Sequence, residues 1–334
     1  MVTETGSSIS KAAVLLLKGE IVAIPTETVY GLAANALDAD AVAAVYIAKD
    51  RPYHNPLIVH LHSTKEIEKY VKEIPSAALT LLKAFAPGPL TVLLLKKDII
   101  PDIVTAGLPH VAIRIPSHPS AQALLKAVNV PLAAPSANRF SGISPTNVQH
   151  VQKHLDGIIP YILDGGICND GIESTVVGFE NDAVVIYRQG AITEEQIKTV
   201  LRDAVPIVHK AKSENTVVQS PGMLAHHYSP DAPLLLVSDI HKAVTQYSDK
   251  RLGVLSFDTV CEDVPLTNQV ILSHKGNVKE AAKNFYASLH YLDELQPDLI
   301  LCQYLPNVGL GKAINDRLTR AAAKHLPVAS TTTA

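Results

Sequence analysis

PTETVYGL (25–32) and KDRPYHNPL (49–57) are the two motifs around which the rest of the chain is organised. The preceding IVAI (21–24) is four apolar residues long, which predicts a short buried strand. Between the motifs, apolar spacing over 38–49 predicts a helix. Two prolines stiffen the second motif, because proline fixes its own φ and restricts the residue before it. A stiff loop with Lys, Arg and Asn suits an anionic ligand, and a solvated helix C-terminus with its usual cations is an equally weighted alternative.

The composition is that of a folded protein with two domains. The chain has 334 residues, of which 47% are hydrophobic and 18% charged, so it can bury a large core. Its net charge of −3 argues against a surface that coats nucleic acid, although a local basic cleft remains compatible with it.

Cysteine content and apolar runs bear on the location of the chain. Cys168, Cys261 and Cys302 are far apart and show no metal-ligand spacing, and an odd number of thiols suits a reducing cytosol. The apolar run AAVLLL (12–17) is too short to span a bilayer and lacks a cationic flank, so we expect neither a signal peptide nor a membrane contact. We therefore expect a cytoplasmic protein.

The first half of the chain mixes strands and helices. We predict strands at 21–24, 57–62, 87–97, 110–116, 130–138, 161–163, 174–179 and 183–188. We predict helices at 8–19, 38–49, 67–85 (two, broken near Pro75), 121–128, 144–155 and 193–203. The last two begin with capping signals, Ser144 before a proline and Thr193 with Gln196 three residues later.

The second half changes character after residue 205. Residues 206–233 contain four prolines and a polar, aperiodic run, which predicts an extended linker. Strands at 234–237, 252–257, 269–273 and 298–303 then alternate with helices at 277–295 and 312–324. This order predicts a small doubly wound domain with a parallel sheet. The predicted organisation is thus a domain over 1–205, a linker over 206–233 and a domain over 234–334.

Polar residues in the first half gather at strand ends and in loops, where an α/β fold commonly has its crevice. Arg114 lies between two isoleucines, and a buried guanidinium needs a partner. A substrate carboxylate and a structural ion pair are equally open as that partner. SPT (144–146) is either a phosphate seat or a plain helix cap, and SAN (136–138) either a ligand contact or a turn. The adjacent His226 and His227 do not have the spacing of a metal site.

Several motifs together resemble one known family. PTETVYGL, KDRPYHNPL, VAIRIP, APSANRFSGISPT and STVV, in this order, resemble the threonylcarbamoyl-AMP synthase family and its YrdC-like catalytic domain. SPGMLAHHYSP (220–230) and GLGKAINDRLTRAA (309–322) resemble the long members of that family. The resemblance covers nearly the whole chain. It implies an α/β protein with a twisted mixed sheet and helices in the N-terminal domain, an extended linker and a small Rossmann-like parallel C-terminal domain.

The resemblance also implies an activity and its partners. The family joins L-threonine, bicarbonate and ATP into threonylcarbamoyl-AMP and pyrophosphate, and the product supplies the threonylcarbamoyladenosine modification of tRNA next to the anticodon. The expected cofactor is Mg²⁺, bound with ATP through phosphates and water and without a protein metal site. The expected partners are ATP, L-threonine, bicarbonate and the downstream tRNA threonylcarbamoyl transfer machinery. The resemblance is also compatible with a weak contact to tRNA.

The family's motif positions carry expected roles onto this chain. The expected ATP-binding residues are Lys49, Arg51, Asn55, His110, Ser136, Asn138, Ser144, Arg188 and Tyr228. The expected threonine-binding residues are Thr28, His60, Arg114, Ala134 and Ser174. Lys49 and Arg51 are the expected catalytic residues, because they would neutralise the phosphates. No general base stands out among Glu27, Asp164 and Glu173. Asp50 replaces a glycine that is frequent in the family, which adds a negative charge near the triphosphate.

The linker and two rival functions complete the expectations. In the family the linker passes over the catalytic opening, so His227 and Tyr228 are expected to close the site over a labile carbamate. One rival function is a non-catalytic RNA-binding or ribosome-assembly module, whose mark is salt-sensitive RNA binding. The other is carbamoyl transfer from carbamoyl phosphate, as in hydrogenase-maturation proteins, whose zinc-finger cysteines and acylphosphatase region are not evident in this sequence.

Overall fold

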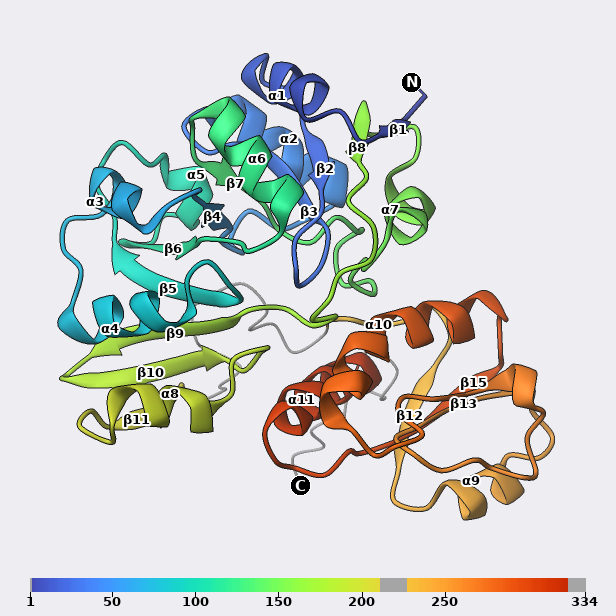
Figure 1. Ribbon diagram of the computed structural model, residues 1–334. Helices are drawn as coiled ribbons and strands as arrows, with labels where there is room; N and C mark the ends of the chain where they lie inside the picture. The colour runs from blue at the N-terminus through green and yellow to red at the C-terminus, as the bar shows by residue number, and fades with distance from the viewer. Residues whose placement is uncertain (1, 211–226, 324–334) are drawn as a thin grey trace, which may run out of the picture.

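Two β-sheets organise the chain (Figure 1). The structure is a computed structural model that describes residues 2–210 and 227–323. Within these residues, one sheet of 11 strands forms the N-terminal part and one sheet of four strands forms the C-terminal part. The α/β class, the mixed N-terminal sheet and the smaller parallel C-terminal sheet are therefore confirmed.

The N-terminal sheet mixes parallel and antiparallel neighbours, in the order β1-β8-β2-β3-β7-β4-β6-β5-β9-β10-β11. Its strands are β1 Glu4–Gly6, β2 Val22–Ile24, β3 Gly31–Asn35, β4 Ile58–His60, β5 Leu90–Leu95, β6 His110–Arg114, β7 Leu132–Ala133, β8 Tyr161–Leu163, β9 Thr175–Glu180, β10 Ala183–Arg188 and β11 Ile207–His209. The pairing places His60, the last residue of β4, opposite Arg114, the last residue of β6. A bridge between Gly31 and Ser136 brings two further predicted motifs to the same part of the sheet.

Helices cover both faces of this sheet (Figure 1). They are α1 Ile9–Leu17, α2 Ala39–Lys49, α3 Ile67–Tyr70, α4 Ser76–Phe85, α5 Asp102–Thr105, α6 Pro119–Val128, α7 Val148–Leu155 and α8 Glu194–Leu201, with a 3₁₀ turn at Thr64–Glu66. Val22 and Ile24 pack with α1 and α6, whereas Ala23 between them packs with α2 on the other face. This follows from the alternation of side chains along a strand.

Several elements differ from the predicted ones. The helix expected to start at Ser144 begins at Val148, because the Asn147 side chain caps it by accepting a hydrogen bond from the His150 N–H. The capping box of Thr193 and Gln196 is confirmed. β3 was not predicted, because its small residues show no alternation of apolar and polar side chains. Ile207–His209, assigned to the linker, pairs with β10 as β11. Of the expected linker, residues 211–226 lie outside the described residues.

The C-terminal sheet is parallel throughout, in the order β12-β15-β13-β14. Its elements are β12 Leu234–Val237, α9 Ile240–Gln246, β13 Leu252–Ser256, a 3₁₀ turn at Leu266–Asn268, β14 Gln269–Ile271, α10 Val278–Glu294, β15 Leu299–Gln303 and α11 Leu310–Ala323. The short helix α9 packs in one apolar cluster, and α10 and α11 pack in another. The doubly wound architecture is thus as predicted, although α9 was not.

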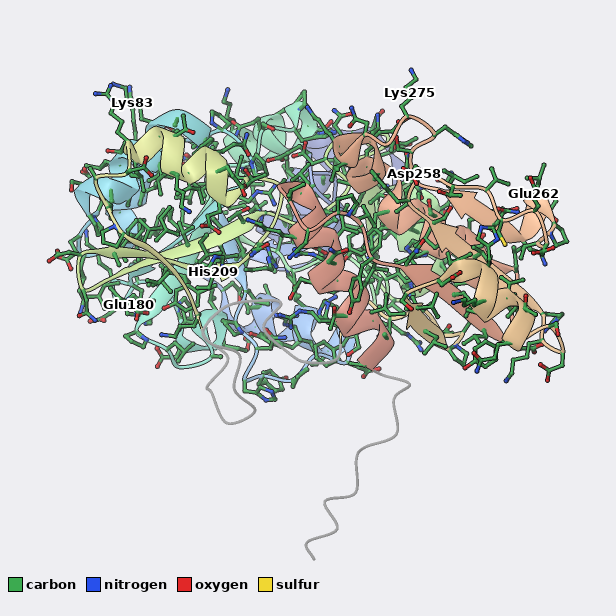
Figure 2. All side chains as sticks on the ribbon, turned by 90° about the horizontal axis from the view of Figure 1, so that it is seen from below. Lys83, Glu180, His209, Asp258, Glu262 and Lys275 are labelled. Carbon is green, nitrogen blue, oxygen red and sulfur yellow. The ribbon has the colours of Figure 1, made fainter. Side chains whose placement is uncertain are left out.

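Helices α10 and α11 form the contact with the N-terminal domain, as the view in Figure 2 also shows. Tyr286 of α10 and Arg317 of α11 both reach Glu173, which lies two residues before the start of β9. Among the described residues, no helix combines the length and the apolar character that crossing a bilayer requires.

Candidate active site

One cavity collects polar side chains from segments far apart in the sequence. The predicted site residues that line it are Thr28, Arg51, His60, Arg114, Ala134, Ser136, Ser174, Arg188 and Tyr228. Glu173 and His227 also line it. The mixed topology explains the gathering, because the ends of β4 and β6 meet the turn after β2 and the segment after β7 at one place in the sheet.

Arg114 dominates one part of the cavity. Its Nη2 lies 2.8 Å from Glu27 Oε1, and its Nη1 donates a hydrogen bond of 2.9 Å to Thr28 Oγ1. Its Nε has no hydrogen-bond partner among the described residues. Burial, with Arg114 nearby, lowers the pKa of His60 to about 3, so the imidazole stays neutral. This part of the cavity offers a buried cation with a spare donor, which suits a carboxylate.

Arg51 enters the cavity from the loop after α2. Its Nε and Nη2 donate to the carbonyl oxygens of Asn55 and Pro56, at 3.1 and 2.9 Å. Burial lowers its pKa to about 10, so the guanidinium remains a cation at neutral pH. Asp50 ends α2 in the left-handed conformation, with φ of 51°, where glycine is favoured. The Asp50 carboxylate is exposed.

Lys49 does not line the cavity, although we predicted that it contacts ATP and acts in catalysis. Its Nζ donates to the carbonyl oxygens of Ser136, at 2.6 Å, and of Asn138. Burial, reinforced by Arg51, holds its pKa well below the usual range. In this structure Lys49 therefore stabilises the backbone of the SAN segment (136–138) through these hydrogen bonds.

Two buried asparagines differ in how well their amides are satisfied. The Asn138 Nδ2 donates to the carbonyl oxygens of Arg139 and Gly142, both at 2.8 Å, and so shapes the loop around it. Asn55 is fully buried, and neither polar atom of its side chain has a hydrogen-bond partner among the described residues. An unsatisfied buried amide costs free energy, so Asn55 points to a ligand contact.

Ser174 and Arg188 form a connected pair in the cavity wall. The Ser174 hydroxyl shares a hydrogen bond of 2.7 Å with Thr91, and Arg188 Nη2 donates to the Ser174 Oγ at 3.0 Å and to its carbonyl oxygen at 2.9 Å. The register of β10 shifts between Ile186 and Arg188, which turns the arginine toward β9.

Tyr228, the second residue of the described segment 227–323, completes the lining. It is buried, it has a φ of 66°, and its hydroxyl has no hydrogen-bond partner among the described residues. The neighbouring His227 is buried too, and burial lowers its pKa to about 3. A left-handed tyrosine with an unsatisfied buried hydroxyl is uncommon, and it marks this short segment for a role at the cavity.

Glu173 joins the C-terminal domain to the cavity wall, a link that the sequence did not reveal. Its carboxylate accepts hydrogen bonds from the Ser144 hydroxyl at 2.7 Å, the Tyr286 hydroxyl at 2.8 and 2.9 Å, and Arg317 Nε at 3.1 Å. Burial raises its pKa, but these partners outweigh burial and leave the pKa below its usual value. A signal was present, because Arg317 interrupts the apolar face of its helix.

The remaining predicted residues lie elsewhere. Ser144 donates to Glu173 and is not the N-cap of α7, so the plain helix-cap alternative for residues 144–146 is wrong. His110 is exposed at the first residue of β6, opposite Leu95 and at the other end of the strand from Arg114. Asp164, a candidate base, is exposed and accepts from the Gly166 N–H.

Comparisons with known proteins cover the same two halves. A Sua5/YciO/YrdC family model, described as "Telomere recombination", matches residues 14–190, and one described as "Threonylcarbamoyl-AMP synthase, C-terminal domain" matches residues 192–323. The threonylcarbamoyl-AMP synthase of Bacillus subtilis is 40% identical, with 94% of this chain and 92% of the relative covered. The one of Pyrococcus abyssi is 37% identical, with 94% of each covered.

Solved structures agree with the sequence relatives. The crystal structure of P. abyssi Sua5 complexed with L-threonine superposes with a TM-score of 0.87, at 35% identity, and covers 96% of this chain and 97% of that one. Matches of this extent over both domains, together with the cavity, lead to one conclusion: this chain belongs to the threonylcarbamoyl-AMP synthase family.

Proposed function

We propose that this chain is an L-threonylcarbamoyladenylate synthase, which converts L-threonine, bicarbonate and ATP into threonylcarbamoyl-AMP and pyrophosphate. The observation that carries the proposal is the shared cavity, in which Arg51 and Arg188 accompany Arg114 although the three lie in separate strands and loops. One ligand with phosphates and another with a carboxylate account for three buried guanidinium groups. The family membership and the threonine complex of P. abyssi Sua5 support the same reaction.

Arg114 is the proposed clamp for the threonine carboxylate. Its Nε has no hydrogen-bond partner among the described residues, and Thr28 already orients the other side of the guanidinium. His60 and Ser174 line the same cavity and offer a neutral imidazole and a hydroxyl to the rest of the amino acid. Ala134 leaves room beside them.

Arg51 and Arg188 are the proposed partners of the ATP phosphates, with Asn55, Ser136 and Tyr228 beside them. Phosphoryl chemistry needs alignment and charge neutralisation more than covalent help, which fixed guanidinium groups supply. The residues present fit Mg²⁺ only in company with the nucleotide, because no described group of three acidic, His or Cys ligands lies at the cavity. When bound with ATP, Mg²⁺ would add charge neutralisation on the phosphates.

The order of bond making follows from the chemistry. The threonine amine and bicarbonate condense to a carbamate with loss of water. A carbamate oxygen then attacks the α-phosphorus, and pyrophosphate leaves. Glu27 is the proposed proton acceptor for the amine, because its carboxylate touches Arg114 and an amino acid carries its amine next to its carboxylate.

The linker and the domain boundaries complete the proposal. We retain two domains joined by a linker, with β11 now counted in the first domain, and with His227 and Tyr228 closing the cavity over the carbamate. Both residues line the cavity, which supports this role. The three unpaired cysteines suit a cytoplasmic location, where the product passes to the tRNA threonylcarbamoyl transfer machinery, with room for a weak tRNA contact.

Pyrophosphate release from ATP tests the proposed reaction. We expect release that requires both threonine and bicarbonate, together with the appearance of threonylcarbamoyl-AMP. Release without threonine contradicts the proposal. Salt-sensitive RNA binding without any release would favour the RNA-binding module, and release that requires carbamoyl phosphate would favour carbamoyl transfer.

A further inference from the structure

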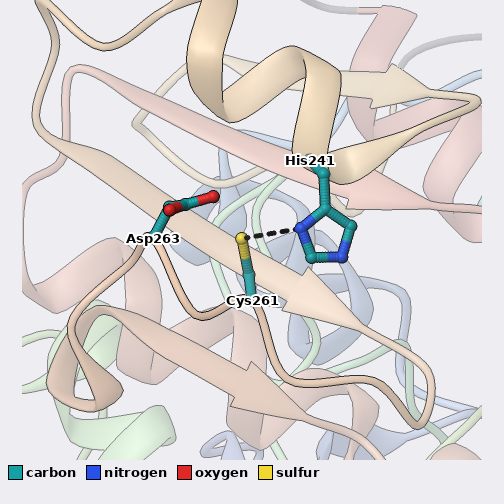
Figure 3. A group of neighbouring side chains, drawn as sticks. All are labelled: His241, Cys261 and Asp263. Carbon is teal, nitrogen blue, oxygen red and sulfur yellow. Dashed lines mark hydrogen bonds between the residues drawn. The ribbon is translucent and has the colours of Figure 1, made fainter.

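A second group of reactive side chains lies in the C-terminal domain, outside the cavity described above. One potential ligand atom from each of His241, Cys261 and Asp263 lies within 4.8 Å of the other two. The His241 Nδ1 is 3.8 Å from the Cys261 Sγ, and Figure 3 shows the sulfur between the imidazole and the Asp263 carboxylate. Within the part of the chain that the structure describes, no other group of three His, Cys, Asp or Glu residues comes as close.

The fold places this group where doubly wound domains bind ligands. After β12 the chain enters α9 on one face of the sheet, and after β15 it enters α11 on the other face. Adjacent strands whose connections leave toward opposite faces open a crevice at their carboxyl ends. A cavity lies at this edge, lined by His241 and Cys261 and by Ser238, Ser256 and Gln303 from the strand ends.

The segment that carries Cys261 and Asp263 is held in place by one buried side chain. Gln269 Oε1 accepts from the Cys261 N–H at 2.9 Å, and its Nε2 donates to the carbonyl oxygens of Cys261 and Val264 at 2.8 and 2.5 Å. On the other side, His241 lies in the first turn of α9, which Asp239 caps. The fold thus fixes the backbone positions of these ligands before any metal binds.

We propose that His241, Cys261 and Asp263 bind a divalent transition metal of the Zn²⁺ type. A thiolate, an imidazole and a carboxylate are the donors that Zn²⁺ takes in tetrahedral sites. Three protein ligands leave one coordination position for water or for a ligand in the crevice. His241 and Asp263 are exposed, so the metal has a path from solvent. Binding deprotonates the thiol and releases H⁺ to solvent, so the affinity rises with pH.

The other two cysteines, Cys168 and Cys302, should not contribute to a metal–thiolate absorption band, so such a band can be assigned to this site. All three cysteines are buried, but neither Cys168 nor Cys302 belongs to a described cluster of potential metal ligands. Burial raises the pKa of Cys168 to about 12 and also raises that of Cys302, so both thiols resist conversion to the thiolate. A metal–thiolate signal should therefore come from Cys261.

Cobalt titration of the full-length chain, after treatment with a chelator, tests the proposal. We expect one equivalent of Co²⁺ to produce a thiolate-to-cobalt charge-transfer band and tetrahedral visible bands, and Zn²⁺ to displace it. Cys261→Ser should abolish the charge-transfer band. His241→Ala and Asp263→Asn should each weaken Co²⁺ affinity by at least about tenfold, since loss even of an outer-sphere partner costs that much.

Matched controls separate a built site from adventitious binding. Cys168→Ser and His274→Ala, the latter an exposed histidine of the same domain, should leave the titration unchanged. A parent chain without the band, a band that survives Cys261→Ser, or unchanged affinity in both exposed-ligand variants overturns the proposal. Because His241 and Asp263 are exposed, their variants decide the question even if Cys261→Ser fails to fold.

Discussion

Replacing Arg317 by methionine should destabilise the protein strongly, because it removes the cation in direct contact with the buried Glu173 carboxylate. Arg317 is fully buried, its Nε is 3.1 Å from Glu173 Oε2, and the glutamate side chain is 8% exposed. Breaking a buried ion pair by removing one partner costs about 3–5 kcal/mol. The hydrogen bonds from Ser144 and Tyr286 remain, so we expect the lower end, about 3 kcal/mol.

A double-mutant cycle isolates the pair from the packing of the arginine. Glu173→Gln together with Arg317→Met removes both charges. The double variant should therefore lose about 1–3 kcal/mol less stability than the two single variants lose in sum. Arg251→Met is the matched control, because its pair with Asp298 is exposed and screened by solvent and should contribute little to stability.

Urea denaturation followed by circular dichroism measures these free energies of unfolding, and its pH dependence adds a second check. The pKa of Glu173 is lower in the folded chain than in the unfolded chain. The stabilisation that the ionised carboxylate gives the folded chain is therefore present above pH 4.5 and is lost as the pH falls through the folded-state pKa. In Arg317→Met the burial that remains should raise this pKa, so the loss should begin at higher pH. An Arg317→Met variant no less stable than Arg251→Met, or an additive cycle, refutes the reasoning.

Three further predictions concern the cavity and the domain contact. Arg51→Ala should lose about 3 kcal/mol of transition-state stabilisation, a roughly hundredfold lower rate of pyrophosphate release, whereas the exposed Arg202→Ala should leave the rate unchanged. Arg114→Ala should weaken threonine binding and spare ATP binding in calorimetry, and the reverse pattern would exclude the carboxylate clamp. His150 of α7 and His290 of α10 stack at 3.8 Å, and burial lowers their pKa values to about 4 and about 2. The unfolded chain therefore binds protons that the folded chain does not, and below pH 6.5 stability should fall by up to about 1.4 kcal/mol per pH unit for each histidine. A flat urea midpoint between pH 7 and pH 5 would contradict this.

Local pattern predicted most of the elements. The strands β2, β6 and β10 and the helices α1, α2 and α10 all lie within the segments expected from apolar periodicity. The capping box at Thr193 was also visible in the sequence, because both of its partners lie within four residues. The linear motifs identified the family, since their order along the chain does not depend on the fold.

Where local signals compete, the sequence was misleading. Ser144 and Asn147 are both good N-cap residues, and the structure uses Asn147 for α7 because the Ser144 hydroxyl is engaged by Glu173. β3 is made of small residues whose place in the sheet comes from its neighbours, β2 and β7, and not from its own pattern.

The sequence by itself determined the alternation of elements, the parallel C-terminal sheet and the family. The tertiary structure alone decided how the buried charges are paired. Arg114 meets Glu27, Lys49 turns to the backbone of Ser136, and Glu173 meets Arg317 from the other domain. These partners are separated by as many as 144 residues in the chain. The physical reason is that apolar periodicity is a local property, which each segment displays alone, whereas the partner of a buried polar group depends on which strand ends the topology brings together.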